Sequence, residues 1–142
     1  MTATRQFCTF YLAQSLFGVE VEKVQEVIRH QEMTQVPLAD PVVGGLINLR
    51  GQIVTALDMR QRLGLSKRGP EQMPMNVVVR GDDGAVSLLV DEIGDVVEVD
   101  ESEFEPPPDT LSGPSREMIL GAFKLKGRLL LLLDTERAMR LA

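Results

Sequence analysis

The sequence contains few of the residue types on which cross-links and metal chemistry depend. Its 142 residues include one cysteine, one histidine and no tryptophan. Cys8 cannot form an internal disulfide, and its aromatic neighbours, Phe7 and Phe10, predict a packed thiol in a strand. His30 and Cys8 are together too few ligands for a zinc site. The sequence therefore predicts no bound metal and no cofactor.

Basic charge and long apolar runs are also scarce. The formal net charge is −6 at pH 7, whereas nucleic acids and anionic membrane surfaces attract clustered Lys and Arg. The longest apolar run, 129–133, is far shorter than the ~20 residues of a bilayer-spanning helix, and no apolar signal region begins the chain. We expect a cytoplasmic protein with no nucleic-acid partner and no direct membrane insertion.

The motifs of common catalytic sites are missing too. The sequence has no glycine-rich phosphate loop and no dinucleotide fingerprint, and His30 lies in a polar stretch, 29–34, typical of a solvated loop. Carboxylates are numerous at 91–105, but they alternate with apolar residues as on the outer face of a strand. We interpret this acidic stretch as a solvated surface that influences which partner docks. An enzyme that uses it is the least favoured alternative, so no catalytic residue is predicted.

What the sequence does contain is an internal repeat. The matching segments are 7–12 with 76–81, 19–28 with 88–97, and 45–58 with 121–134. The first two pairs share an offset of 76 − 7 = 69, and the third, after an insertion, has an offset of 121 − 45 = 76. A Leu-basic-Gly turn and a closing aspartate recur in the same order. We predict a duplication, and the alternative is two unrelated hairpins of similar pattern.

Each half is predicted to begin with two strands and a short helical turn. The first strand covers 6–12 or 76–80, and the second ends near Val21 or Val90. An Asp-Gly turn at 82–84 joins the two strands of the second half. Apolar residues three apart then predict one apolar face on a helical turn, and they are Val21, Val24 and Val27 in the first half and Val90, Ile93 and Val96 in the second.

A hairpin and a capped helix follow in each half. Gly51 and Gly127 are predicted to turn through positive φ, and Asn48 is predicted to shape the first of these turns. Asp58 and Asp134 follow the last strand and are predicted to cap short helices, the second of which ends near residue 141.

Short antiparallel strands with one terminal helix predict a small barrel in each half, because closure removes exposed sheet edges. The predicted fold class is therefore mainly β, with two tandem barrels and short helices. The halves cover about 6–65 and 75–141, and a polar linker at about 66–74 joins them.

Several blocks of the sequence resemble the CheW family of bacterial chemotaxis adaptors. The blocks are 17–21, 23–27, 36–37, 45–54 and 57–58 in the first half, and 89–93, 105–107, 120–121 and 132–134 in the second. The Asn-Leu-Arg-Gly sequence at 48–51 is highly specific, and the other blocks are moderately so. The likeness covers nearly the whole chain and identifies 1–142 as a single CheW-like domain.

The resemblance implies two five-stranded SH3-like barrels and a non-enzymatic adaptor. Members of this family couple chemoreceptors, through the receptor's cytoplasmic helical hairpin, to the regulatory domain of the histidine kinase CheA. It also implies that the chain is recruited to receptor arrays at the inner face of the membrane.

The resemblance assigns partner binding to two pairs of residues. Glu26 and Arg50 match the family's charged pair beside the receptor- and kinase-binding surfaces, and the alternative is an ordinary exposed ion pair. Val24 and Val27 match the apolar edge on which a receptor helix lies, and the alternative is packing in the core.

The sequence departs from the family pattern at 38–40, which is an unusual lead into Pro41, at 55–56, where a Pro-containing pair is usual, and at Met59. These departures leave open which receptor or kinase the chain serves. The alternatives are a CheW-like adaptor of another motility or signalling pathway, and a regulatory domain excised from a larger signalling protein.

Overall fold

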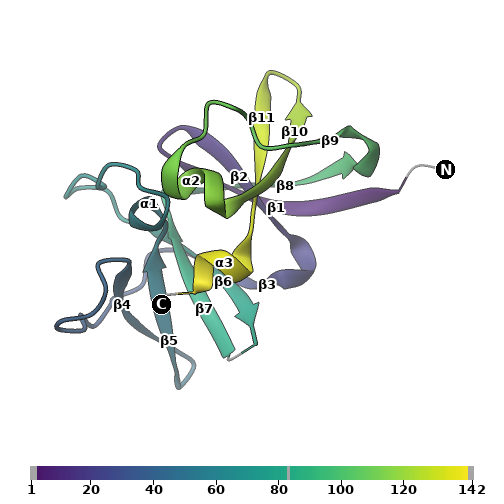
Figure 1. The fold of residues 1–142 in the computed structure, drawn as a ribbon. Helices are drawn as coiled ribbons and strands as arrows, with labels where there is room; N and C mark the ends of the chain where they lie inside the picture. The colour runs from purple at the N-terminus through teal and green to yellow at the C-terminus, as the bar shows by residue number, and fades with distance from the viewer. Residues whose placement is uncertain (1–2, 83, 141–142) are drawn as a thin grey trace.

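The computed structural model describes residues 3–82 and 84–140, and in these ranges the chain is mainly β (Figure 1). The strands are β1 (Thr4–Leu12), β2 (Ser15–Glu20), β3 (Val24–Ile28), β4 (Val43–Leu49), β5 (Gln52–Asp58), β6 (Met75–Gly81), β7 (Gly84–Val90), β8 (Glu92–Asp100), β9 (Phe104–Glu105), β10 (Ile119–Leu125) and β11 (Arg128–Leu133). Three short helices, α1 (Met59–Arg62), α2 (Gly113–Met118) and α3 (Thr135–Met139), and two 3₁₀ turns, Val21–Lys23 and Glu101–Glu103, accompany them. None of the helices in these ranges is long and apolar enough to cross a membrane.

The strands form two sheets, and each sheet combines strands from both halves of the chain. One sheet has the order β8-β1-β2-β11-β10-β9, and the other has the order β3-β6-β7-β5-β4. We expected each barrel to be built from one half alone; instead β1 and β2 pair with second-half strands, and β6 and β7 pair with first-half strands. In Figure 1 the purple β1 and β2 lie among the green and yellow strands of the second half.

The two sheets repeat the same pairing. Phe7 lies opposite Val97 on β8, and the residues 69 positions away, Asn76 and Ile28, lie opposite each other on β6 and β3 (76 − 7 = 69; 97 − 28 = 69). The offsets of 69 and 76 likewise relate the parallel pair of β7 and β5 to that of β2 and β11. Positions related by these offsets are called equivalent below. The boundaries 6–65 and 75–141 of the two sequence repeats remain a prediction. Each sheet contains strands from both repeats, so these boundaries do not separate the two sheets.

The fold class predicted from the sequence is confirmed: the chain is mainly β, with two SH3-like barrel units and short helices. In each unit, the strand that begins the last hairpin, β10 or β4, has a short pairing on its outer side. β9 pairs with β10 in one unit, and Thr34 pairs with Leu46 of β4 in the other. These short contacts shield edges that would otherwise expose unpaired amides and carbonyls.

The helical turn predicted from the three-residue apolar spacing is largely a strand. Only Val21–Lys23 forms a 3₁₀ turn, and Val24 begins β3, where it lies opposite Val79. In the second half Ile93 and Val96 both lie on β8. β-branched residues fit a pleated surface well, and pairing with a neighbouring strand overrides a weak helical spacing.

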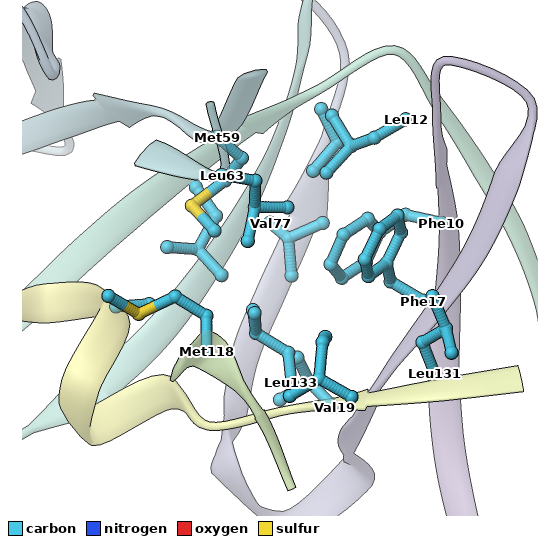
Figure 2. Packing of buried hydrophobic residues seen from close by; sticks show 14 of the residues in the cluster. Phe10, Leu12, Phe17, Val19, Met59, Leu63, Val77, Met118, Leu131 and Leu133 are labelled. Carbon is cyan, nitrogen blue, oxygen red and sulfur yellow. The ribbon is translucent and has the colours of Figure 1, made fainter. Parts of the chain in front are cut away.

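The largest apolar cluster lies between the two sheets and joins them. Figure 2 shows Phe10, Phe17 and Leu12 of one sheet facing Val77 of the other, with Met59 and Leu63 beside them. α2 and α3 add Met118 and Ala138 to the same cluster. Smaller clusters fill each unit separately, one around Phe7 and Phe123 and one around Ile47 and Leu89. Because the shared cluster draws on both sheets, burial couples the two units into one cooperative structure.

Candidate functional site

The hairpin between β4 and β5 brings a strained arginine to its tip. Arg50 has φ 52° and Gly51 has φ 87°. Two consecutive positive φ values are typical of the tight turns that match strand twist, but the first is unfavourable for an arginine. Asn48 lies just before the turn, and its Oδ1 accepts a hydrogen bond from the Gly51 amide at 2.9 Å. Asn48 and Gly51 therefore shape the turn and present the Arg50 side chain.

Arg50 reaches across to β3 and forms an ion pair with Glu26. The side chain of Arg50 is 77% exposed, whereas that of Glu26 is only 17% exposed. Glu26 Oε2 accepts the bond from Arg50, and Oε1 is buried with no hydrogen-bond partner among the described residues. A carboxylate oxygen that has lost water without gaining a donor carries a free-energy cost, which a donor from a docked partner would remove.

The two valines assigned to the partner edge have different environments. Val24 is half-buried and packs against the apolar cluster between the sheets. Val27 is 37% exposed, and the equivalent residue on β8, Val96, is 59% exposed. The structure therefore places Val27 and Glu26 on an accessible edge strand. Val24, at the start of the same strand, packs against the core.

The remaining predicted residues lie at turns and helix starts. Asp58 caps α1 by accepting a bond from the Arg60 amide at 3.0 Å, and Asp134 caps α3 by accepting one from the Arg137 amide at 3.1 Å. Gly127 has φ 79°, at the position equivalent to Gly51. The Asp-Gly turn at 82–84 and the predicted helix end near 141 fall partly outside the described residues.

Asp91 has a role that the sequence did not reveal. Its carboxylate accepts hydrogen bonds from Arg60 Nε at 2.9 Å, from Arg68 Nε at 3.0 Å and from the Ala13 amide at 2.9 Å. Arg68 also lies 3.6 Å from Asp58. We predicted Asp91 to be part of a solvated acidic face, and for this residue the prediction is wrong, because its side chain is only 15% exposed. Arg60 and Arg68 lie far from Asp91 in the sequence, and neither was a candidate.

These contacts shift the pKa values of Asp91 and Arg60. Burial alone would raise the pKa of Asp91, but the bonds from Arg60, the Ala13 amide and Arg68 lower it below its usual value. The hydrogen bond to Asp91 raises the pKa of Arg60. The Asp91 carboxylate is therefore ionised at neutral pH beside the Arg60 guanidinium, and the two charges neutralise each other.

Most other acidic residues in the stretch do form an exposed surface. They are Glu92, Asp95, Glu98, Glu101 and Glu103. Glu98 and Glu101 border a groove beside the Val21–Lys23 turn, together with Glu20, Glu22 and Arg5. Arg5 pairs with Glu20 at 2.5 Å, and the further carboxylates of Glu22, Glu98 and Glu101 give the groove a net negative charge. Such a groove favours a partner with basic side chains.

The candidate reactive groups do not gather into a site. His30 is exposed, and its Nδ1 lies 3.3 Å from the Pro74 carbonyl. Cys8 is half-buried, and burial raises the pKa of its thiol. In the part of the chain that the structure describes, no three His, Cys, Asp or Glu side chains are arranged to hold a metal ion. The arrangement offers surfaces for docking, with an ion pair and an exposed valine on one edge.

Comparisons with known proteins agree with this geometry. A family model described as the CheW-like domain matches residues 6–142. The chemotaxis protein CheW of Treponema pallidum is 26% identical over 136 residues, which are 93% of this chain and 80% of that protein. The chemotaxis protein CheW of Bacillus subtilis is 30% identical over 123 residues, which are 87% of this chain and 79% of that protein.

A solved structure gives the same result. The crystal structure of scaffolding protein TtCheW from Thermoanaerobacter tengcongensis matches with a TM-score of 0.87 and 26% sequence identity, over 98% of this chain and 94% of that chain. The resemblance inferred from the sequence is confirmed, and the chain belongs to the CheW-like domain family, whose named relatives are chemotaxis and scaffolding proteins.

Proposed function

We propose that the chain is a non-enzymatic adaptor that couples chemoreceptors to the histidine kinase CheA in bacterial chemotaxis. The observation that carries this proposal is the Arg50–Glu26 pair, which is displayed at a hairpin tip beside the exposed Val27. An arginine held at φ 52° is a local cost that the hairpin does not require, because Lys126 at the equivalent turn has no positive φ. Backbone strain of this kind is often retained at functional sites.

The edge strand β3 is suited to the cytoplasmic helical hairpin of a receptor. Val27 supplies an exposed apolar contact, and Glu26 supplies a buried carboxylate oxygen that has no donor in the described part of the chain. A helix laid along such an edge buries its apolar stripe and satisfies the carboxylate from its polar flank. Val24 packs against the apolar cluster between the sheets and so anchors β3 on the core.

The regulatory domain of CheA is the second proposed partner. The family resemblance gives that domain the same fold, so equivalent edges of the two proteins can pack in pseudo-symmetric fashion. Arg50 extends into solvent from the hairpin tip and can form charged hydrogen bonds with an acidic partner. Binding to receptors would hold the chain at the inner face of the membrane without any insertion of its own.

The proposal is tested by charge reversal in a three-component assembly. Purified chain is mixed with the regulatory domain of its cognate kinase and with a receptor signalling domain, and co-sedimentation is measured. We expect Arg50→Glu to weaken assembly about tenfold or more, and Glu26→Lys added to Arg50→Glu to restore part of the loss. Additive losses in this cycle would show that the two charges do not act as a pair.

The matched control is Lys126→Glu, the same charge change at the equivalent hairpin turn. Lys126 is exposed, so the variant tests net charge without touching the Arg50–Glu26 pair. We expect its assembly to resemble that of the unmodified chain. If the unmodified chain sediments with neither partner, the proposed function is refuted.

A further inference from the structure

A buried polar pair links the core of one barrel to the end of the edge strand β3. Asn76 on β6 is 1% exposed and Ser87 on β7 is 0% exposed. The Ser87 hydroxyl donates to Asn76 Oδ1 at 2.7 Å, and Asn76 Nδ2 donates to the Arg29 carbonyl at 3.1 Å. Arg29 directly follows the last residue of β3. Ser87 therefore orients the amide that holds the chain where it leaves β3.

The other barrel shows that the fold does not need this polar pair. The equivalent residues are Phe7 (76 − 69 = 7) and Gly18 (87 − 69 = 18), in the same register on β1 and β2. Phe7 is fully buried, and a side chain at Gly18 would lie only 3.3 Å from Phe7 Cβ and 3.0 Å from Leu130. In one barrel the Phe7 ring packs beside Gly18, and in the other Asn76 and Ser87 occupy the equivalent positions and hydrogen-bond to each other.

The two barrels differ at the edge strand beside this position, which is β8 next to Phe7 and β3 next to Asn76. The ladder between β1 and β8 continues past Phe7 to Thr4, opposite Asp100. The ladder between β6 and β3 stops at Asn76, opposite Ile28. The residue equivalent to Arg5 is Pro74 (5 + 69 = 74), and a proline has no amide hydrogen to donate to a neighbouring strand. The end of β3 therefore lacks the ladder that holds the end of β8, and the Asn76 side chain supplies a bond there.

We propose that Asn76, oriented by Ser87, is a positioning residue that holds the end of β3, so that this edge strand and its residues Glu26 and Val27 stay in place for a docked partner. The inference rests on the proposed function of β3 as a docking edge. Glu26 and Val27 are three and two residues from Arg29, so movement of the Arg29 carbonyl shifts both side chains. A strand at the edge of a sheet has one neighbour only, and it frays more readily than a central strand.

The test replaces both side chains together, so that neither of them keeps a buried polar group whose partner has been removed. The double variant Asn76→Leu with Ser87→Ala removes both bonding partners, and Asn76→Phe with Ser87→Gly copies the other barrel. We expect amide exchange at residues 27–29 to become about tenfold faster, the size expected for loss of one hydrogen bond. Central amides of β6 and β7 report in the same experiment that the variant is folded. We expect affinity for the receptor signalling domain to fall about tenfold.

Thr9→Val is the matched control in the other barrel. Thr9 Oγ1 donates to the Asp95 carbonyl on β8 at 2.5 Å, and the residue equivalent to Thr9 is already a valine, Val78. This variant should speed exchange on β8 and leave residues 27–29 unchanged. Unchanged exchange at 27–29 in both double variants would overturn the proposal.

Faster exchange with full affinity would overturn the role of β3 as the docking edge if Val27→Ala also keeps full affinity. The Val27→Ala result thus separates failure of the proposed function from failure of the positioning role. If Val27→Ala weakens binding while the double variants do not, the positioning role alone is refuted.

Discussion

The carboxylate of Asp91 joins segments that are distant in the sequence. Asp91 is the single residue between β7 and β8, which belong to different sheets. Arg60 comes from α1, Arg68 from the linker, and Ala13 from the turn between β1 and β2. The apolar cluster between the sheets attracts without direction, whereas these hydrogen bonds have direction. We infer that the cluster of charges helps to set how the two sheets meet.

Asp91→Asn is therefore expected to destabilise the chain by about 3 kcal/mol, because it removes the carboxylate that two largely buried guanidinium groups share and leaves only Asp58, 3.6 Å from Arg68, near them. The pKa of Asp91 is lowered in the folded state, so its contribution is present at pH values above its unfolded pKa of about 4 and is lost as the pH falls below that value. Urea unfolding from pH 7 to pH 3 measures both effects.

The control is Asp95→Asn, which removes an exposed carboxylate four residues further along. We expect a change within about 0.5 kcal/mol, as for most surface substitutions. The Asp91→Asn chain should also lose less stability than the unmodified chain as the pH falls. Equal stability losses on acidification in both chains would contradict the assigned role of Asp91.

At the scale of single elements, local chemistry was predictable and long-range partners were not. The hairpin at Arg50 and Gly51 and the caps at Asp58 and Asp134 follow from residues adjacent in the sequence, and the structure shows them. The helical turn predicted around Val24 is a strand because β6 lies beside it, and β6 begins about 50 residues later. Arg60 was missed for the same reason, since its partner is Asp91.

Helix α1 makes a second long-range contact, through Arg62. Its guanidinium donates to the carbonyls of Arg137, Ala138 and Arg140 at 2.8, 3.1 and 2.7 Å, at the C-terminal end of α3. The Arg137 carbonyl also accepts from the Arg140 amide at 3.2 Å. The last carbonyls of a helix generally lack amide partners within it, so a cation there both bonds them and complements the helix dipole. Five residues are too few for a helix to persist without such support.

We expect Arg62→Met to lower stability by about 1–2 kcal/mol and to speed amide exchange in α3, while strands far from it keep their protection. Methionine retains the apolar stem and removes the three bonds. Arg140→Met is the control, because it removes a charge from the same helix end while the Arg140 carbonyl still accepts from Arg62. If both variants exchange alike, net charge and not the three bonds stabilises α3.

At the scale of the whole molecule, the repeat was visible in the sequence but the exchange of strands was not. The offsets identify which strands are alike. They do not show whether the first hairpin of each half pairs with strands of its own half or of the other half, because the local sequence pattern is the same in both cases. Divergence between equivalent positions then makes the two barrels different surfaces. Arg50 stands where the other barrel has Lys126, and α2, which precedes β10, has no counterpart among the described residues between β3 and β4. The two barrels thus share one pairing scheme and present different surfaces.

The exchange predicts that neither half folds alone. A fragment of residues 1–70 contains β1 and β2 without β8 and β11, and a fragment of 71–142 contains β6 and β7 without β3 and β5. Each would expose its side of the shared apolar cluster and several unpaired strand edges. We expect each purified fragment to show the circular dichroism and amide dispersion of an unfolded chain, and the mixed fragments to regain the spectrum of the intact chain.

The comparison that decides the point is the intact chain cut between residues 70 and 71 after folding. The cut lies in the linker and breaks no strand pairing, so the nicked chain and the mixed fragments should give the same spectrum and the same concentration-dependent unfolding. A fragment that is folded and monomeric on its own would mean that its strands can close without the other half. The interleaved sheets would then not be what binds the two barrels into one unit.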